Sequence, residues 1–544
     1  MNQKRIFLLF IILVAGFSLR SMAQQNTHVP ATPPSTTDTA TQKIEILNYT
    51  KRLTFQTLND STRLTIIAGD VKLRQGTTLF FCDSCVMNNY TNTFEAWGKG
   101  KQVHIDDDTT DIYSNHLLYY TEKKLAYLDG NVKLTDGKGV LTTPSLEYDM
   151  ETNIGIYKNG GKVVNEKTVL TSKEGWYYAD LKDIYFKKDV KLKDPAYDIT
   201  TDSLLYNTES KTTRFISSTI IHDTTGKTIL TKEGFYNQET KQAEFGRRPV
   251  IYDKNMTVRG DRITQNDSIL TVEGNAIVVD TAQGQTIIGG VIYRNSKTQA
   301  ILATRKPLMI IKQEKDSVFI AADTLFSGRL TDKFGIDSII VDTLKGLKAA
   351  AMDPKDSSNR YFEAYGNVRI FNDSLQAVGD SMFYSFKDSI FRLFKDPVVW
   401  AQENQVTGDT IYLYTENKKP KKVEAFENGF MVNRLDNEVY NQIKSTRIDG
   451  WFIDGNIDSL RAKGFAECIY YITDDDSAYT GINESHSDVI DIYFVQKELD
   501  KVVFRSTVNG TVWPMKQKSP SEMKLNNFRW LESRRPKSKF EMYE

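Results

Sequence analysis

The stretch Asp129-Gly130-Asn131-Val132-Lys133-Leu134, followed twelve residues later by Leu146-Glu147-Tyr148, is one copy of a pattern that recurs through most of the sequence. Five successive copies have a tyrosine at the same repeat position: Tyr119, Tyr148, Tyr178, Tyr206 and Tyr236. These tyrosines are 29, 30, 28 and 30 residues apart. The register continues at Gln265 and Tyr293 and, after a blurred stretch, at Tyr384 and Tyr414. A fixed period of about 30 residues indicates a repeat architecture, in which each unit buries its apolar face by stacking on its neighbours.

Each copy carries a second large apolar residue two positions before the repeat position. These residues are Leu117, Leu146, Trp176, Leu204, Met382 and Tyr412. Because side chains on a strand alternate between its two faces, both residues of a copy should point to the same side. The pattern therefore predicts an inner apolar face lined by Leu117, Tyr119, Leu146, Tyr148, Trp176, Tyr178, Leu204, Tyr206, Tyr236, Tyr293, Met382 and Tyr384.

A Gly or Asn turn that opens into an alternating strand follows each Leu-x-Tyr strand by about a dozen residues. Further examples are Gly274-Asn275 and Gly366-Asn367, and variants without glycine are Lys188-Asp189 and Lys395-Asp396. Each unit is therefore an antiparallel pair of strands. A straight arm of a dozen residues would span roughly 40 Å, well beyond the usual strand, so we expect every arm to bend at the same place.

Such bends would join two facing sheets along a spine. The expected fold class is thus all-β: an elongated, repeated antiparallel β-jelly roll, shaped as a V-shaped two-sheet trough with the Leu-x-Tyr face inside. The abundance of Tyr, Phe, Thr, Val and Ile favours strands. Helix-length apolar periodicity between strands, which α/β enzymes of this length show, is almost absent.

The N-terminus has the features of an export signal. Lys4 and Arg5 precede an apolar run at 6–17, and Ser21-Met22-Ala23 places small residues where signal peptidase needs them. Twelve apolar residues are too few for a helix that spans a bilayer. We therefore predict a signal peptide at 1–23, followed by a flexible Thr/Pro-rich tether at 24–42, and a periplasmic protein that is soluble or peripheral to the outer membrane.

The remaining chain divides where the register is lost. We predict β-jelly-roll modules at 43–327, an irregular junction at 328–360, further repeats at 361–472, and a C-terminal cap or docking segment at 473–544. Lys plus Arg equals Asp plus Glu at 70 each. No net field is therefore available to attract nucleic acid or an acidic membrane surface, and nucleic-acid binding is not expected.

Catalytic and metal-binding patterns are absent from the sequence. None of the five His residues has a partner at metal-ligand spacing, and the start of a calcium loop at 454–458 lacks the Gly and Glu that such a loop needs. Cys82 and Cys85 form a CxxC pair, which after export could suggest a redox role. However, residues three apart on a strand face opposite sides. We expect no enzyme activity, no cofactor and no metal site.

The signal sequence, the Gly-Asn-Val strands, and the Asp-Ser-Leu and Leu-x-Tyr strands at thirty-residue spacing resemble the OstA family, and within it the long OstA-like proteins of the Bacteroidetes type. The resemblance covers residues 43–473. It implies an LptA-like role in lipopolysaccharide transport and outer membrane biogenesis, in which an apolar jelly-roll interior shields the acyl chains of lipid A. It also implies that the twelve inner-face residues named above are the lipid-binding positions. The implied partners are lipopolysaccharide, other transport components at the inner and outer membranes, and further copies of the chain joined end to end.

Two alternatives remain open from the sequence. The chain could be a structural envelope scaffold whose β core is sealed by its own side chains. Less favoured is a secreted β-solenoid acting on polysaccharide, because such enzymes have shorter repeats and a clustered set of carboxylates on one coil.

Overall fold

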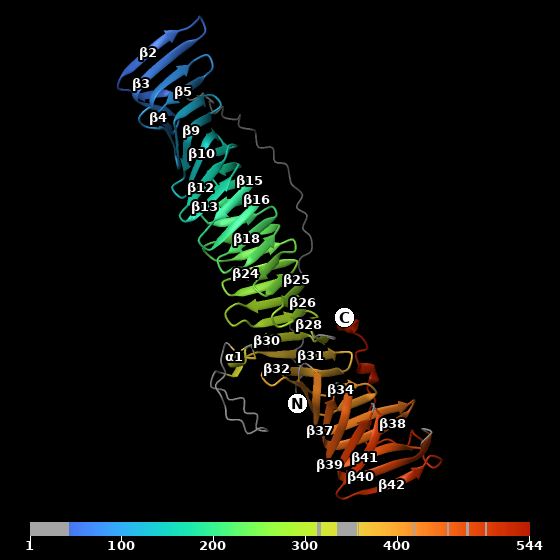
Figure 1. Cartoon of the computed structure of the whole chain (residues 1–544). Helices are drawn as coiled ribbons and strands as arrows, with labels where there is room; N and C mark the ends of the chain where they lie inside the picture. The colour runs from blue at the N-terminus through green and yellow to red at the C-terminus, as the bar shows by residue number, and fades with distance from the viewer. Residues whose placement is uncertain are drawn as a thin grey trace, which may run out of the picture.

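The computed structural model describes residues 43–543, apart from 313–316, 335–355, 357, 417–418, 454–455, 475–477 and 496–497. These residues form 42 strands, one short helix α1 (Leu330–Phe334) and two 3-10 helices, η1 (Glu532–Arg534) and η2 (Lys539–Tyr543). The strands stack along a long, twisted body, from β2 at one end to β42 at the other (Figure 1). The predicted all-β, elongated, antiparallel fold is confirmed. The predicted signal peptide and tether lie outside the described residues.

The chain advances as a meander of rungs, and each rung crosses two facing sheets. Some rungs are single long strands: β3 (Arg63–Gln75), β4 (Thr78–Asn88), β9 (Leu125–Thr135), β10 (Val140–Asp149), β15 (Asp183–Lys193), β16 (Tyr197–Asn207), β25 (Ile269–Asp280), β26 (Gln285–Asn295), β31 (Tyr361–Phe371), β32 (Gln376–Ser385), β37 (Lys419–Asp436), β38 (Val439–Ile453), β39 (Asn456–Thr473) and β40 (Tyr479–Val495).

The other rungs are interrupted at the bend and appear as two short strands each. These pairs are β1 (Glu45–Asn48) and β2 (Arg52–Thr57), β5 (Thr93–Trp97) and β6 (Val103–Asp107), β7 (Thr110–Ser114) and β8 (His116–Tyr120), β11 (Ile154–Tyr157) and β12 (Gly161–Asn165), β13 (Thr168–Ser172) and β14 (Glu174–Tyr178), β17 (Thr212–Phe215) and β18 (Thr219–Asp223), β19 (Thr228–Thr231) and β20 (Glu233–Asn237), β21 (Ala243–Gly246) and β22 (Val250–Asp253), β23 (Met256–Arg259) and β24 (Arg262–Asn266), β27 (Ile301–Thr304) and β28 (Leu308–Lys312), β29 (Ser317–Ala321) and β30 (Thr324–Gly328), β33 (Ile390–Phe394) and β34 (Val398–Ala401), β35 (Asn404–Thr407) and β36 (Thr410–Glu416), and β41 (Glu498–Arg505) and β42 (Asn509–Pro514).

We call the half that contains β8, β14 and β20 sheet 1, and the half that contains β7, β13 and β19 sheet 2. Consecutive rungs pair antiparallel in both sheets; for example, β9 and β10 pair from Val140↔Thr135 in sheet 2 to Asp149↔Leu125 in sheet 1. Hairpins connect the rungs at the two free edges. The line of bends forms the spine, and the two rows of hairpin tips form the mouth of the trough.

The Gly-Asn turns lie at the spine. Gly130 and Asn131 have φ values of 75° and 51°, and the glycine-free pair Lys188 and Asp189 has 65° and 53°. Two successive left-handed residues insert an irregularity into the ladder, as seen between Lys187 and Val190, and this turns the strand from one sheet into the other. Glycine and asparagine are the residues that adopt this conformation at least cost. The bend expected from the strand length is thus encoded by this motif.

Rungs on either side of the predicted junction are direct neighbours in the sheet. β30 pairs with β31 from Thr324↔Tyr365 to Gly328↔Tyr361. The helix α1 begins the connection between these strands, and most of the connection lies outside the described residues. The division of the chain into modules remains a prediction.

The rungs continue through Pro514, beyond the predicted start of the C-terminal segment at residue 473. Residues 515–543, which we call the C-terminal strap, then run back over the outer face of sheet 2. Met523 packs with Ile469 and Ile482, and Met542 packs with Leu308 and Ala321. The chain therefore ends beside the middle of the body, near β28 and β31 (Figure 1).

Candidate functional site: the interior and mouth of the trough

The space between the two sheets holds one continuous apolar cluster. It extends from Ile67 near the N-terminal end to Phe494 near the C-terminal end. In a stack of rungs about 4.8 Å apart, such a cluster forms an uninterrupted apolar path along the molecule. This path is the feature that the Leu-x-Tyr pattern predicted.

Most of the predicted lining residues face this interior. Leu117, Tyr119, Leu146, Tyr148, Leu204, Tyr206 and Met382 are at most 2% exposed, and Tyr236 and Tyr384 pack against the same cluster. Burial raises the pKa of Tyr119, Tyr148 and Tyr206 above the ordinary tyrosine value. These side chains are therefore neutral at physiological pH.

Three of the predicted residues face outward, so their assignment to the interior was wrong. Trp176 and Tyr178 lie on the outer face of β14, whereas Tyr177 between them is 2% exposed. Tyr293 is 40% exposed, and its neighbour Ile292 fills the interior. Tyr412 and Tyr414, which continue the repeat register, also lie on the outer face, and the inward residues of β36 are Ile411 and Leu413.

The position of the bend explains both the successes and the errors. In rungs that run from sheet 2 into sheet 1, the residues two and four positions after the bend face inward. The central residues of these bends are Asp83, Asn115, Pro144, Lys173, Asp202, Lys232, Asp261, Gly290, Asp323, Asp380 and Asp409. Counting from Lys173 selects Gly175 and Tyr177, and counting from Gly290 selects Ile292 and Arg294. The aspartate of the Asp-Ser-Leu motif marks the bend, and counting from it could have shown which alternate residues of the strand face inward.

These aspartates also stabilise the spine. The Asp83 carboxylate accepts hydrogen bonds from the backbone N–H groups of Lys99 and Gly100 at 2.5 and 2.7 Å. The side chains of Asn275 and Asn367 donate to Asp261 and Asp323, each at 2.9 Å. The motif thus satisfies polar backbone and amide groups that the bend takes out of the regular ladder.

Both cysteines of the CxxC pair face the interior, contrary to the expectation from strand alternation. The bend at Asp83 lies between them, so Cys82 precedes it and Cys85 follows it on the same side; they are 7% and 0% exposed. The position before the bend holds a small buried residue in other rungs, as at Ser114 and Thr143. The hydrogen bond between the two thiols and burial raise the pKa of Cys82. Both thiols are free in the structure.

We predict that the three thiols, Cys82, Cys85 and Cys468, react slowly in the native protein. Burial also raises the pKa of Cys468, to about 12, and the thiolate is the reactive form. A thiol-specific chromogenic reagent should modify the native protein at least about a hundredfold more slowly than the protein in denaturant. A thiol that reacts in the native state at the denatured rate would contradict this placement.

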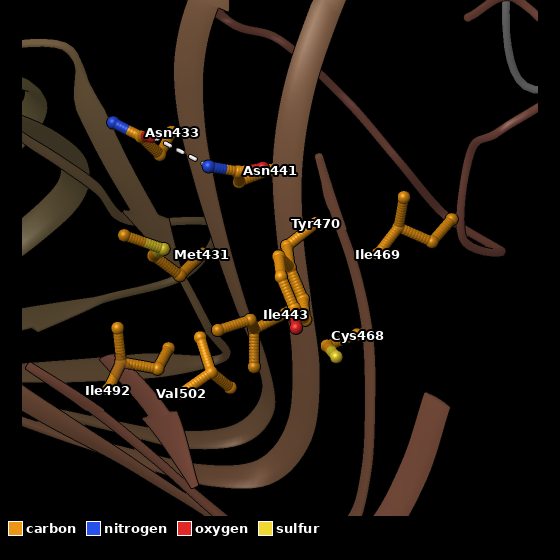
Figure 2. A pocket seen from close by; sticks show the side chains of 9 residues that line it. All are labelled: Met431, Asn433, Asn441, Ile443, Cys468, Ile469, Tyr470, Ile492 and Val502. Carbon is orange, nitrogen blue, oxygen red and sulfur yellow. Dashed lines mark hydrogen bonds between the residues drawn. The ribbon is translucent and has the colours of Figure 1, made fainter. Parts of the chain in front are cut away.

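The interior is filled by its own side chains. Two pockets that reach into it between described residues are both small. One, of about 10 Å³, lies between the sheets near the C-terminal end, where Met431, Ile443 and Cys468 from sheet 2 face Ile492 and Val502 from sheet 1 (Figure 2). The other, of about 30 Å³, is lined by residues that include Asp253 and Arg294. Ligand pockets usually measure about 300–1,000 Å³, so a lipid chain requires the sheets to separate.

Polar side chains from the two rows of hairpin tips meet across the mouth. We call this set of contacts the latch. Its members are Tyr119 Oη to Gln75 Oε1 (2.5 Å), Gln75 Nε2 to Thr121 O (3.0 Å), Thr208 Oγ1 to Asp136 Oδ2 (3.0 Å), Asn165 Nδ2 to Thr208 O (2.7 Å), Lys211 Nζ to Glu166 Oε1 (2.8 Å), Gln238 Nε2 to Tyr197 Oη (2.5 Å) and Arg294 Nη1 to Asp253 Oδ2 (3.7 Å).

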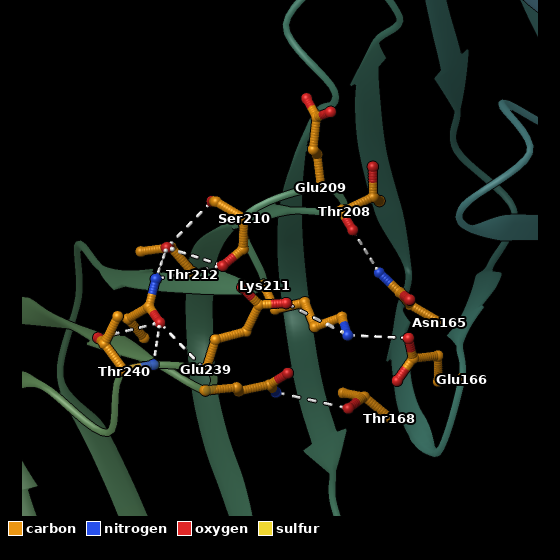
Figure 3. Close-up of polar contacts among 12 residues, drawn as sticks. Asn165, Glu166, Thr168, Thr208, Glu209, Ser210, Lys211, Thr212, Glu239 and Thr240 are labelled. Atoms are coloured by element: carbon orange, nitrogen blue, oxygen red, sulfur yellow. Dashed lines mark hydrogen bonds and ion pairs between the residues drawn. The ribbon is translucent and has the colours of Figure 1, made fainter. Parts of the chain in front are cut away.

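Figure 3 shows the centre of the latch, where the tip at 165–168 faces the tip at 208–211. Asp136 takes part as an ionised group. Burial disfavours its charged form, but hydrogen bonds from the N–H groups of Gly139 and Lys138 and from Thr208 outweigh this, and its pKa lies below the ordinary value. Hydrogen bonds of this kind contribute about 1 kcal/mol each. The latch therefore closes the mouth without a covalent bond or an apolar seal.

Within the described residues no group of three or more His, Cys, Asp or Glu side chains could hold a metal ion. No helix in the same part of the chain is long and apolar enough to span a membrane. The strand pairs along the body are antiparallel, as in β9 with β10 and in β39 with β40, which is not the pairing of a parallel β-helix. The fold and its interior thus define a two-sheet jelly-roll trough with an apolar core.

Residues 41–202 match the family model described as OstA-like protein. This match confirms, for these residues, the resemblance found in the sequence. No curated protein matches the chain. Among solved structures, the crystal structure of LptH, described as the LptA homologous periplasmic component of the conserved lipopolysaccharide transport device from Pseudomonas aeruginosa, matches 20% of this chain and 84% of that chain at 12% identity, with a TM-score of 0.18.

Proposed function

We propose that this protein is a periplasmic carrier of lipopolysaccharide that takes part in outer membrane assembly. Its apolar interior shields the acyl chains of lipid A and forms part of a bridge to the outer membrane, in contact with transport components at both membranes. The observation that carries the proposal is the continuous apolar interior in a chain whose residues 41–202 are OstA-like.

The chemistry of the ligand fits this interior. Acyl chains bind without directional contacts and gain about 0.8 kcal/mol for each buried methylene. A trough of aliphatic and aromatic side chains can therefore hold them without catalytic groups, cofactors or metals. Residues such as Leu117, Tyr119 and Tyr206 would exchange contacts with one another for contacts with the lipid.

Loading requires the mouth to open, because the interior is filled in the closed state. The spine is continuous backbone, so the mouth is the side on which the two sheets can separate. There the sheets are joined by the side-chain contacts of the latch, each of which can exchange its partner for water. We therefore place lipid entry at the latch.

The filled interior also favours a second candidate, a structural envelope scaffold with a sealed core. In this role the inward tyrosines are only core residues, and the latch is a permanent closure. The two roles differ in one measurable property, the access of lipid to the space between the sheets.

Photo-crosslinking in living cells tests the proposal. A photoreactive residue is placed at Tyr119, Tyr148 or Tyr177 in turn, and adducts are detected by blotting for lipopolysaccharide. Tyr178, the outward neighbour of Tyr177, and Lys133 are the matched controls. We expect adducts at the inward positions, at least about tenfold above those at the controls. Folded protein without adducts at any inward position would favour the sealed scaffold.

A further inference from the structure

Three carboxylates are almost completely buried on the outer face of sheet 1, near the C-terminal end. Glu424, Asp449 and Asp491 are 1%, 2% and 2% exposed. They lie at the same level on successive strands, because Glu424 pairs with Asp449, Asp449 with Arg461, and Arg461 with Asp491. They belong to the face opposite the apolar interior, which holds Ala425 and Ile448 of the same strands.

Each carboxylate is covered by two cationic side chains. The contacts are Glu424 with Lys422 and with Arg447 (2.6 Å), Asp449 with Arg447 (2.7 Å) and Lys463 (3.1 Å), and Asp491 with Arg461 (2.5 Å) and Arg505 (2.7 Å). We call these five cations the cationic face. Five positive charges thus stand over three negative charges.

The negative and the positive side chains lie at different depths below the protein surface. The carboxylate side chains are 2–3% exposed, whereas the cationic side chains are 26–54% exposed. In an ordinary surface pair of this protein, Lys173 with Asp189, both partners are exposed, at 68% and 66%. A molecule that approaches the cationic face therefore meets the positive groups, and the negative groups lie beneath them.

Asp449 and Asp491 remain ionised. Hydrogen bonds from Arg461 hold the pKa of Asp491 below its ordinary value. For Asp449, burial disfavours ionisation, but hydrogen bonds from Arg447 and Lys463 outweigh it and its pKa is also lowered. These fixed charges hold the cations in place, and so do aromatic rings: Arg447 lies 4.9 Å from the ring centre of Phe426.

This face has no covering segment among the described residues. The C-terminal strap crosses sheet 2, on the other side of the same rungs, where it contacts Gln405 and Gln442. Four of the rungs that carry the cationic face are the long strands β37–β40, with 15 to 18 residues each. The result is a broad sheet surface with cations spaced at the strand separation.

We propose that the cationic face docks on the surface of a lipid bilayer that contains anionic headgroups. The argument is charge complementarity: cations held on one sheet face match the phosphates of a headgroup layer, and each Lys or Arg near an anionic bilayer contributes about 1 kcal/mol. Half-buried aromatic side chains on this face, such as Trp451, suit the interface between the bilayer and water. The net charge of zero predicted no attraction to an acidic membrane. A net charge does not show that, on this face, the cations are exposed and the carboxylates are buried beneath them. This inference goes beyond lipid transport and does not depend on it.

Vesicle co-flotation tests the inference with the chain from Gln24 onward. The probes are phosphatidylglycerol-containing vesicles and purely phosphatidylcholine vesicles. We expect binding to the former only, and loss of binding as salt rises from 0.05 to 0.5 M, because the screening length falls below the spacing of the charges.

The variant is Lys422→Gln/Lys463→Gln/Arg505→Gln, which leaves each buried acid one cation, Arg447 or Arg461. It should bind anionic vesicles on the order of 100-fold more weakly, since about 1 kcal/mol per cation is about fivefold each. The control, Lys173→Gln/Arg247→Gln/Arg262→Gln, removes three cations from exposed ion pairs and should bind like the unmodified chain.

Unchanged binding of the triple variant, equal loss in the control, or no binding of the unmodified chain to anionic vesicles would each overturn the inference. Binding to polyglutamate but not to vesicles would likewise overturn it and indicate an acidic protein partner. Circular dichroism checks folding. If the triple variant does not fold, Arg505→Gln alone serves, with an expected decrease of about fivefold.

Discussion

Ending the chain at Lys518 is expected to destabilise the C-terminal rungs and to make the protein self-associate. The strap is fastened by two glutamines of sheet 2. Gln442 donates to Met523 O and accepts from Leu525 N, both at 2.9 Å, and Gln405 donates to Arg529 O at 2.8 Å and accepts from Leu531 N at 2.7 Å. Each amide thus binds the backbone of one strap segment in the manner of a neighbouring strand.

Three apolar side chains of the strap fill sites on the outer face of sheet 2. Met523 and Met542 are 4% and 2% exposed, and Leu531 packs against Val398 and Trp400. Burial of such a side chain stabilises by about 2 kcal/mol, so truncation should lower the free energy of unfolding by on the order of 5 kcal/mol. It would also expose Trp400 in an apolar patch of the kind that drives association.

Calorimetry, binding of an apolar dye and light scattering measure these effects. The control is Phe540→Ala, which removes a strap side chain that is 70% exposed and should change nothing. A truncated chain that stays monomeric and unfolds at the same temperature would show that the strap does not stabilise the sheet.

Locking the mouth is expected to abolish loading of the trough. Asp136→Cys/Thr208→Cys places two thiols where the side chains now meet across the mouth at 3.0 Å. Oxidation should join the two sheets at this point, and if lipid enters through the latch, the adduct at Tyr148 should fall at least about tenfold because the sheets can no longer separate. Reduction should restore it.

Each single substitution, Asp136→Cys or Thr208→Cys, is the matched control and should load normally under oxidising conditions. The native cysteines are buried and should not interfere. Full adduct in the oxidised double variant would indicate that lipid enters from an end of the stack, and entry at the latch would then be wrong.

Much of the fold could be predicted from the sequence because it depends on local chemistry repeated many times. Gly130-Asn131 and Gly274-Asn275 adopt left-handed conformations at low cost, so these bends are visible as a motif. Arg247-Arg248 bends in the same conformation without the motif. The alternation of Leu204 and Tyr206 identifies an apolar strand face in the same way. Tyr177 and Tyr178 are adjacent, and the spacing between tyrosines predicted Tyr178 as the inward residue, whereas the inward residue is Tyr177. The distance from the bend, not the distance from the previous tyrosine, determines which residues face inward.

The sequence by itself determined the strand pairs, their period, the bends and the apolar interior, because each follows from backbone preference and side-chain alternation within one repeat. Only the tertiary structure decided which residues meet between repeats. The latch joins Asp136 to Thr208, 72 positions apart, and the strap joins Gln405 to Arg529, 124 positions apart. The depth of Asp449 and Asp491 beneath their cations has the same origin. Such contacts depend on how far the sheets twist and close, and no local pattern encodes that distance.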